Sequence, residues 1–354
     1  MLPARRLLVQ TILVTGGAGF FGGVLKRKLL ADGYKCVSYD LVPDENRHEN
    51  LVSIQGDLRD AELIESVFAQ YPFSAVQHCA AMLAHGLKLD EQEIWNSNVE
   101  ATRAVAEACK RHGVKNLVFT STNCLWASNP GHAIAEDEPP APVETYGRAK
   151  LESEKVLLTY SDFINVAIIR CPTIIESGRL GLLAILFEFI DDNKNVWLVG
   201  KGSNRYQFIY AGDLARACIS AATLGRTGTF HIGSDEVETL REVFEAVIIA
   251  AGSKSKVRSL PKGPAIAAMK LAHHLHISPL GPYHYKMIAE DFLFDTTKIK
   301  RELNWSPTLK NSQMLVRAYQ YYSAHRSEIE QRSDVSAHSK PASMGVIRLL
   351  KWIS

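Results

Sequence analysis

Short apolar runs alternate with amphipathic stretches along the first half of the chain. The stretches between the runs carry apolar side chains at helical spacing, as in VEATRAVAEACKRH at residues 99–112. Strands that alternate with helices in this way indicate a parallel sheet with crossover helices. The predicted strands are residues 12–14, 35–39, 51–54, 75–79, 117–120 and 166–170. The predicted fold class is therefore α/β, with a doubly wound parallel sheet.

The pattern loosens in the second half, where Pro- and Gly-rich loops surround an apolar helix predicted near residues 180–190. A late strand near 229–233 is expected to return to the main sheet. The chain ends in GVIRLLKWIS, an amphipathic segment for which docking on the protein's own surface or on a second subunit is favoured over membrane contact. We expect a first domain at 10–175, a smaller α/β substrate-binding lobe at 176–322 and a polar tail at 323–354.

Composition and charge exclude several classes of function. The 40 Lys and Arg residues and 38 Asp and Glu residues are scattered, so no basic stripe marks a nucleic-acid site. The six cysteines form no CxxC pair, which favours reduced thiols in a cytoplasmic protein. No apolar run is long enough to cross a bilayer, and no secretory signal is recognised. His273, His274 and His276 lack spaced partners, so no metal site is expected.

A glycine-rich turn, TGGAGFFG, stands between the first predicted strand and a helical run. Gly16 permits the tight turn, Gly19 lets the backbone approach a pyrophosphate, and Gly22 allows close helix packing, which is typical of a Rossmann-type dinucleotide site. Asp40 ends the second strand, where a carboxylate accepts hydrogen bonds from the adenosine ribose and repels a 2′-phosphate. The predicted cofactor is therefore NAD, and Arg47 nearby leaves NADP open.

Tyr146 and Lys150 stand four residues apart in the helical segment ETYGRAKLESEK, so both side chains share one face. A phenol titrates near ~10 in water, and it acts at neutral pH only where positive charge stabilises the phenolate. Lys150 and an oxidised nicotinamide would supply that charge. Residues 116–122 end in FTST at the carboxyl edge of the predicted sheet, which places Thr122 to bind a substrate hydroxyl, with Ser121 as its competitor.

These motifs resemble the extended short-chain dehydrogenase/reductase family, within the NAD-dependent sugar epimerase/dehydratase group, over residues 10–320. The resemblance rests on TGGAGFFG, GDL, HCAA, SNVEAT, FTST, the Pro-rich approach EDEPPAPVETYGRAK and RCPTIIESG. It implies a catalytic triad of Thr122, Tyr146 and Lys150, and a homodimer. Together with the glycine turn and Asp40, it implies that NAD contacts Gly16, Gly19, Phe20, Phe21, Gly22, Asp40, Asp57, Leu58, Ala80, Ala81, Met82, Asn98, Thr120, Ser121, Tyr146, Lys150 and Pro172.

Two departures from the family pattern bear on the reaction. Dehydratases of the group follow the catalytic Thr with Asp and Glu, whereas this chain has Asn123 and Cys124, which disfavours elimination of water. Epimerases that hold a nucleotide-sugar diphosphate commonly have Asn where Thr173 stands and Arg about where Tyr206 stands, although Arg205 is adjacent. The expected substrate-binding residues are Thr122, Asn123, Thr173 and Arg205.

The leading hypothesis from the sequence is an epimerase of a nucleotide-linked sugar, in which Tyr146 moves a proton while a hydride passes to NAD and returns to the opposite face. The alternative is an NAD(P)-dependent dehydrogenase or reductase of a hydrophobic alcohol or ketone, similar to the 3β-hydroxysteroid dehydrogenase and dihydroflavonol reductase branches. The apolar run LGLLAILFEFI favours that alternative. A non-catalytic NAD-binding scaffold is the third hypothesis, and its signature would be a lost Tyr or Lys.

Overall fold

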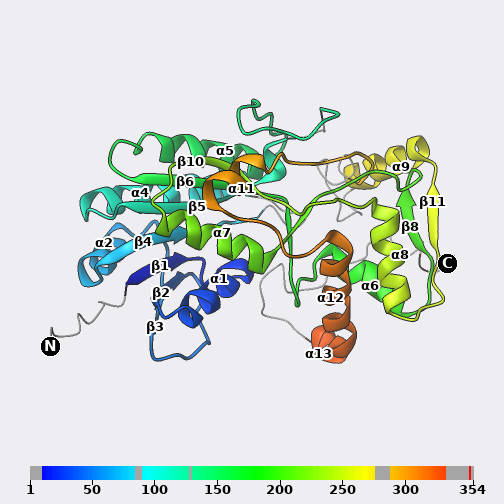
Figure 1. Cartoon of the computed structure of the whole chain (residues 1–354), viewed down its shortest axis with the longest axis horizontal. Coiled ribbons are helices and arrows are strands. Elements are labelled where there is room, and N and C mark those ends of the chain that lie inside the picture. The colour runs from blue at the N-terminus through cyan, green and yellow to red at the C-terminus, as the bar shows by residue number, and fades with distance from the viewer. Residues whose placement is uncertain (1–9, 84–89, 127–129, 276–287, 332–350, 352–354) are drawn as a thin grey trace.

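The central sheet of the protein has seven parallel strands in the order β10-β6-β5-β4-β1-β2-β3 (Figure 1). The computed structural model describes residues 10–83, 90–126, 130–275, 288–331 and 351. The strands of this sheet are β1 (Thr11–Thr15), β2 (Lys35–Asp40), β3 (Leu51–Gln55), β4 (Phe73–His78), β5 (Asn116–Thr122), β6 (Asn165–Cys171) and β10 (Gly228–His231). The strand order reverses between β1 and β4, which confirms the predicted doubly wound Rossmann fold.

Helices cover both faces of the sheet, as Figure 1 shows. One face carries α1 (Phe20–Ala31), α7 (Ala211–Thr223) and α11 (Thr297–Leu303); the other carries α2 (Ala61–Gln70), α4 (Ala101–Arg111) and α5 (Thr145–Leu158). Successive strand residues point to opposite faces, so Leu13 packs in the core under α2 and α4 while Val14 packs in the core under α1 and α7. A sheet buried on both faces explains why the strands read as continuous apolar runs.

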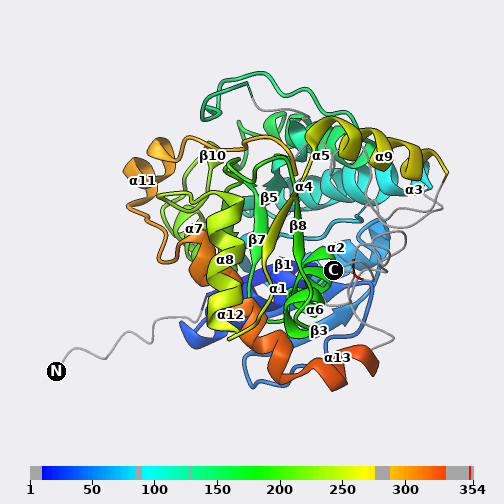
Figure 2. The same cartoon turned by 90° about the vertical axis from the view of Figure 1, so that its right-hand side faces the viewer.

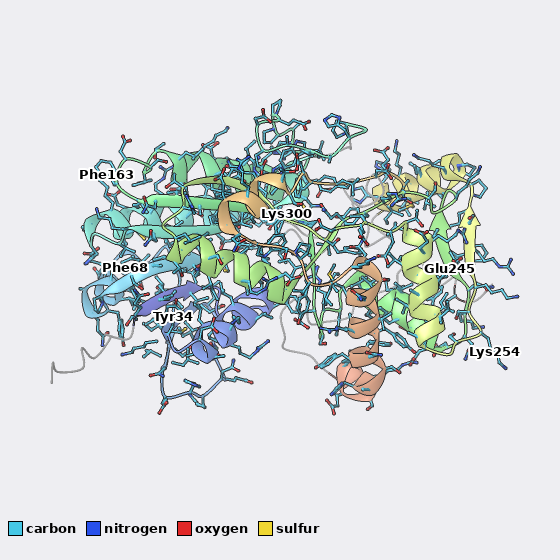
Figure 3. All side chains as sticks on the ribbon, in the orientation of Figure 1. Tyr34, Phe68, Phe163, Glu245, Lys254 and Lys300 are labelled. Carbon is cyan, nitrogen blue, oxygen red and sulfur yellow. The ribbon has the colours of Figure 1, made fainter. Side chains whose placement is uncertain are left out.

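A second group of elements lies beyond the carboxyl ends of the strands (Figures 1 and 2). It contains β7 (Thr173–Ile175) paired with β9 (Phe208–Tyr210), β8 (Val196–Val199) paired with β11 (Val257–Leu260), and the helices α6 (Leu182–Asp191), α8 (Leu240–Ala250), α9 (Lys262–His274), α12 (Asn311–Ala324) and α13 (Arg326–Gln331). Figure 3 labels Glu245 and Lys254 in this group, and Phe68 and Phe163 at the remote end of the sheet. The group has a hydrophobic core of its own, which includes Phe187.

The helix predicted at residues 99–112 begins differently from the prediction. A short helix, α3 (Glu91–Trp95), runs into a π-helical turn, η1 (Asn96–Glu100), and only then into α4. The wider turn releases backbone carbonyls from the regular ladder. The carbonyl of Asn98 accepts hydrogen bonds from the hydroxyls of Thr102 at 2.5 Å and Ser153 at 3.1 Å. Hydrophobic spacing alone does not reveal such a turn, because it says nothing about which side chains bond the carbonyl of Asn98.

The C-terminal segment is described at one residue. Lys351 forms ion pairs with Glu188 and Asp192 of α6, so this residue contacts the protein's own surface. The rest of the amphipathic end and most of the polar tail, residues 332–350 and 352–354, lie outside the described residues. Among the described residues, no helix combines the length and the apolar content that crossing a bilayer requires.

Candidate active site

The glycine-rich turn joins β1 to α1 at the carboxyl edge of the sheet. Gly16 has a φ of +69°, which favours glycine, and its amide donates to the carbonyl of Tyr39 at 2.8 Å. A Cβ on Gly16 would stand 2.8 Å from the backbone of Ala80, and one on Gly22 would stand 2.0 Å from the carbonyl oxygen of Gly16. The turn therefore has room for backbone only, and the N-terminus of α1 follows it directly. This geometry fits a pyrophosphate held by helix amides.

Replacing Gly22 with alanine is expected to displace the turn and to lower NAD binding. The new methyl group would press on the Gly16 carbonyl, which is backbone and cannot swing aside, and overpacking of this kind costs about 1–3 kcal/mol of stability. NAD released from the denatured protein and the thermal unfolding midpoint measure the two effects. Gly263→Ala is the matched control, because nothing lies within 4 Å of its Cβ position. Equal NAD content in the two variants would contradict the predicted role of the turn.

Asp40 lies beside the glycine turn, half-buried at the end of β2. One carboxylate oxygen accepts the amide of Ala18 at 3.0 Å, and the other accepts the amide of Val42 at 3.3 Å. The carboxylate thus ties the turn to the second strand and stays partly open to solvent. The predicted contact of Asp40 with the adenosine ribose stays a prediction. Arg47, which left NADP open, is exposed in the loop that follows.

A buried ion pair that the sequence did not indicate lies beneath the turn. Lys26 of α1 is fully buried, donates to the carbonyl of Gly17 at 3.1 Å, and pairs with Asp44. Asp44 also accepts the hydroxyl of Ser38 at 2.7 Å. Burial acts to raise the pKa of Asp44, but the bonds from Lys26, Asn46 and Ser38 outweigh it and lower the pKa to about 2. The pair ties the loop after β2 to the glycine turn.

The residues expected near the nicotinamide follow β4. Ala80, Ala81 and Met82 are half-buried or exposed, and the amide of Ala80 donates to the hydroxyl of Thr15 at 3.3 Å. The side-chain amide of Asn98 donates to the carbonyl of Met82 at 2.9 Å and to that of Ile94 at 2.7 Å. Asn98 therefore holds this segment in place from the π-helical turn.

The remaining predicted cofactor residues have mixed surroundings. Asp57 pairs with Arg59 at 2.6 Å, whereas Leu58 and Pro172 are buried. Phe21 packs in the hydrophobic core under α1, while the neighbouring Phe20 is half-buried. The contacts of all these residues with NAD stay predictions.

The structure brings Thr122, Tyr146 and Lys150 together. Thr122 lies at the end of β5 and Tyr146 in the first turn of α5, and the threonine side chain acts to lower the pKa of the phenol. One turn later, the Lys150 ammonium donates to the carbonyl of Thr120 at 2.8 Å and lies 3.7 Å from the centre of the Phe119 ring. The i to i+4 spacing on α5 and the end of one strand are thus enough to assemble the set.

Burial governs the titration of both groups. It raises the pKa of Tyr146 above its usual value, against the hydrogen bond from Thr122 and the positive charge of Arg179. It lowers the pKa of Lys150 to about 8, against the charges of Cys171, Glu154 and Cys79. At pH 7 the ammonium of Lys150 is therefore still mostly charged, and the phenol is neutral until further positive charge arrives beside it.

The partners of Thr122 and Ser121 differ, which distinguishes between the two candidates for the catalytic hydroxyl. The hydroxyl of Ser121 donates to a carboxylate oxygen of Glu154 at 2.5 Å, and Glu154 pairs with Arg170 of β6 at 2.7 Å. Ser121 is therefore engaged behind the site, while Thr122 contacts the phenol. Glu154 lies four residues after Lys150 on the same face of α5. The Tyr-x₃-Lys-x₃-Glu spacing in the sequence could have indicated that Glu154 lies on the same helix face as Tyr146 and Lys150.

The positions that depart from the family pattern form one cluster. The side-chain amide of Asn123 donates to the phenol oxygen of Tyr206 at 2.8 Å, and the hydroxyl of Thr173 lies 3.2 Å from the same oxygen. Tyr206 and Asn123 are buried. Arg205 does not join this cluster, because its side chain is exposed and donates to the carbonyl of Val237. The sequence alone did not show that these three positions meet.

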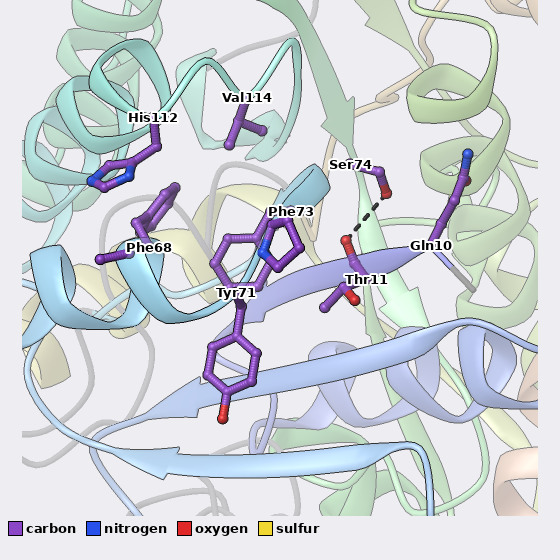
Figure 4. A pocket seen from close by; sticks show the side chains of 10 residues that line it. Gln10, Thr11, Phe68, Tyr71, Phe73, Ser74, His112 and Val114 are labelled. Atoms are coloured by element: carbon purple, nitrogen blue, oxygen red, sulfur yellow. Dashed lines mark hydrogen bonds between the residues drawn. The ribbon is translucent and has the colours of Figure 1, made fainter. Parts of the chain in front are cut away.

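Two other features lie apart from this site. A hollow of about 540 Å³ opens at the amino ends of β1 and β4, the opposite edge from the glycine turn (Figure 4). It is lined by Gln10, Thr11, Phe68, Ala69, Tyr71, Pro72, Phe73, Ser74, His112 and Val114.

Within the described ranges, no three His, Cys, Asp or Glu side chains are grouped as metal ligands. His273 and His274 end α9, and His276 lies outside those ranges.

Comparison with known proteins identifies relatives over most of the chain. A model of the NAD dependent epimerase/dehydratase family matches residues 12–233. The uncharacterized protein y4nG of Sinorhizobium fredii is 33% identical, covering 98% of this chain and 86% of that protein. The probable UDP-arabinose 4-epimerase 3 of Arabidopsis thaliana is 28% identical, covering 86% and 79%. The crystal structure of the Bordetella bronchiseptica enzyme WbmG in complex with NAD aligns with a TM-score of 0.75 at 22% identity, covering 92% and 97%.

Proposed function

The chain belongs to the NAD-dependent epimerase/dehydratase family, an enzyme family that uses NAD, and on that premise we propose that it is an epimerase of a nucleotide-linked sugar. The observation that carries the proposal is the joined set of Thr122, Tyr146 and Lys150 without the acidic pair that dehydratases place after the threonine. The relative named as a UDP-arabinose 4-epimerase supports the same class of substrate and reaction.

In the proposed reaction, Tyr146 moves the proton of a sugar hydroxyl. Thr122 would donate a hydrogen bond to the phenol, and Lys150 places an ammonium on the same face of α5. When bound, NAD supplies the hydride acceptor and the positive charge that lowers the phenol's pKa. The deprotonated phenol, a phenolate, would then accept the hydroxyl proton as the carbon is oxidised, and the phenol would return that proton as the carbon is reduced. The expected NAD-contacting residues around the glycine turn would hold the cofactor beside these side chains.

The site is poorly equipped to eliminate water. Elimination requires an acid and a base beside the sugar, but Asn123 is an amide that bonds the phenol of Tyr206. The carboxylate of Glu154, one turn after Lys150 on α5, is buried and paired with Arg170. We therefore favour epimerisation over dehydration, with Asn123 and Thr173 contacting the sugar.

The lobe at residues 176–322 is proposed to cover the substrate, and the second copy of a homodimer is proposed as the partner. The apolar run behind the dehydrogenase alternative has another explanation in the structure. It forms α6, whose buried residues Ala184, Ile185, Phe187, Phe189 and Ile190 belong to the core of the lobe. A hydrophobic substrate is therefore not needed to account for it.

Incubation of the purified holoenzyme with UDP-linked sugars tests the proposal. We expect inversion at one carbon, followed by nuclear magnetic resonance of the sugar, with no net rise in absorbance at 340 nm. A steady rise at 340 nm with NAD and a hydrophobic alcohol, without inversion of any sugar nucleotide, would instead support the dehydrogenase alternative. Loss of the sugar's 6-hydroxyl as water would identify a dehydratase.

A further inference from the structure

The side chain of Lys26 on α1 has no exposed surface and lies directly beneath the glycine turn. Its ammonium donates to the carbonyl of Gly17 at 3.1 Å and pairs with the carboxylate of Asp44, whose side chain is 1% exposed. Removing two charges from water is costly, and apolar side chains of similar volume often serve the stability of a protein equally well or better. The position of this pair therefore asks for a reason other than packing.

Asp44 lies in the loop between β2 and β3 and is bonded from several sides. Its carboxylate accepts the hydroxyl of Ser38 on β2 at 2.7 Å, and the backbone and side-chain amides of Asn46 at 3.1 and 2.7 Å. Its own amide donates to the hydroxyl of Ser53 on β3 at 3.3 Å. A Cβ on Gly17 would stand 2.3 Å from the Ser38 hydroxyl, so the glycine turn packs on the same group. The pair thus joins the loop, two strands and the turn.

The Lys26 ammonium and the Asp40 carboxylate bond opposite ends of one peptide group. The carbonyl of Gly17 and the amide of Ala18 belong to the same trans peptide bond, in which they point in opposite directions. Lys26 bonds the carbonyl at 3.1 Å, and Asp40 accepts the amide at 3.0 Å. The cation therefore fixes the plane of the peptide that anchors Asp40. It also polarises this peptide, which makes the amide a stronger donor to the carboxylate.

We propose that Lys26 is a positioning residue that, together with Asp44, holds Asp40 beside the adenosine ribose and so enforces the choice of NAD over NADP. A carboxylate fixed at that place repels a 2′-phosphate, whereas one that turns toward solvent leaves room for it. Arg47 is exposed in the same loop, and release of the loop would free its guanidinium to bind the phosphate. The inference goes beyond the proposed reaction and rests on the predicted ribose contact of Asp40.

Competition between the two cofactors tests this role on the purified protein. The double variant Lys26→Met with Asp44→Asn removes both charges, keeps side chains of similar size and leaves no buried charge unpaired. Each protein is equilibrated with NAD and NADP at equal concentrations, and the bound nucleotides are released by denaturation and quantified. We expect the ratio of bound NADP to bound NAD to rise at least about fivefold over the wild type, as for the loss of one hydrogen bond to a charged group.

Three single variants accompany the double variant. Lys28→Met is the matched control, because it makes the same change in the same helix but breaks only the partly exposed pair with Asp32, and its ratio should equal that of the wild type. Asp44→Asn should shift the ratio in the same direction as the double variant, since it leaves the buried ammonium without its counter-charge and weakens the anchor of the loop. Asp40→Asn tests the premise and should raise the ratio at least as much.

The ratio distinguishes a positioning role from a structural one. A wild-type ratio in the double variant would overturn the inference, and so would a loss of both nucleotides at an unchanged ratio, which is the result expected of a purely structural pair. If the double variant does not fold, as its unfolding midpoint would show, the ratio in Asp44→Asn decides. An unchanged ratio in Asp40→Asn would remove the premise itself. Because no sugar nucleotide enters the experiment, these outcomes are independent of the proposed reaction.

Discussion

Tyr146→Phe is expected to lower kcat for sugar epimerisation by about 10²–10⁴-fold, because the variant keeps the ring and loses the group that moves the proton. Bound NAD and the unfolding midpoint should change little, since the ring still fills its place on α5. The rate is measured with the sugar nucleotide that the wild type inverts. A fall in kcat without a comparable rise in KM would show that the lost interaction acts in the chemical step.

Tyr160→Phe is the matched control for this variant. Tyr160 lies just beyond the same helix, is half-buried, and donates its hydroxyl to Glu107 at 2.9 Å, away from Thr122 and Lys150. Its substitution removes a phenolic hydroxyl without touching the catalytic set, so kcat should stay within about twofold of the wild type, as for mutations remote from the chemistry. Equal rates for Tyr146→Phe and the wild type would refute the assigned proton carrier.

Glu154→Gln is expected to destabilise the protein by about 3–5 kcal/mol, because it leaves a buried guanidinium without its counter-charge. Arg170 contacts the Glu154 carboxylate through two nitrogens, at 2.7 Å and at 3.1–3.2 Å, and both side chains are almost fully buried. The guanidinium also lies 5.2 Å from the ring centre of Trp126 and donates to the carbonyl of Glu136. The loss should lower the urea unfolding midpoint without changing its slope.

Two further variants separate the ion pair from other effects. Glu152→Gln removes a carboxylate from the same helix, but its pair with Lys155 is largely exposed, so its cost should stay below about 1 kcal/mol. The double variant Glu154→Gln with Arg170→Met removes both charges and should recover part of the stability. If Glu154→Gln proved no less stable than Glu152→Gln, the buried pair would not be the support behind Ser121 and Lys150 that the structure indicates.

Local sequence patterns were enough to predict much of the fold. Each apolar run in the first half forms a strand within one or two residues of its prediction. The inner strands are apolar along most of their length because helices bury both of their faces, whereas the edge strand β3 is only half-buried or exposed. The glycine turn could also be predicted, because a Cβ at Gly16 or Gly22 would collide with backbone and the turn therefore needs glycine at these positions. The π-helical turn before α4 was missed, because hydrophobic spacing does not show that the carbonyl of Asn98 accepts a hydrogen bond from Ser153 on another helix.

Local patterns along the chain account for the parts of the site whose geometry is local. Tyr146 and Lys150 share a face because helical spacing dictates it, and Thr122 ends a strand that points at the same edge. Polar groups that meet across long separations in the chain are visible only in the folded protein. Lys26 and Asp44 form a buried pair, Ser121 bonds Glu154, and Asn123, Thr173 and Tyr206 converge on one phenol oxygen. Such groups are ordinarily exposed, so nothing in their spacing marks them until folding removes water and leaves each polar atom to find its partner.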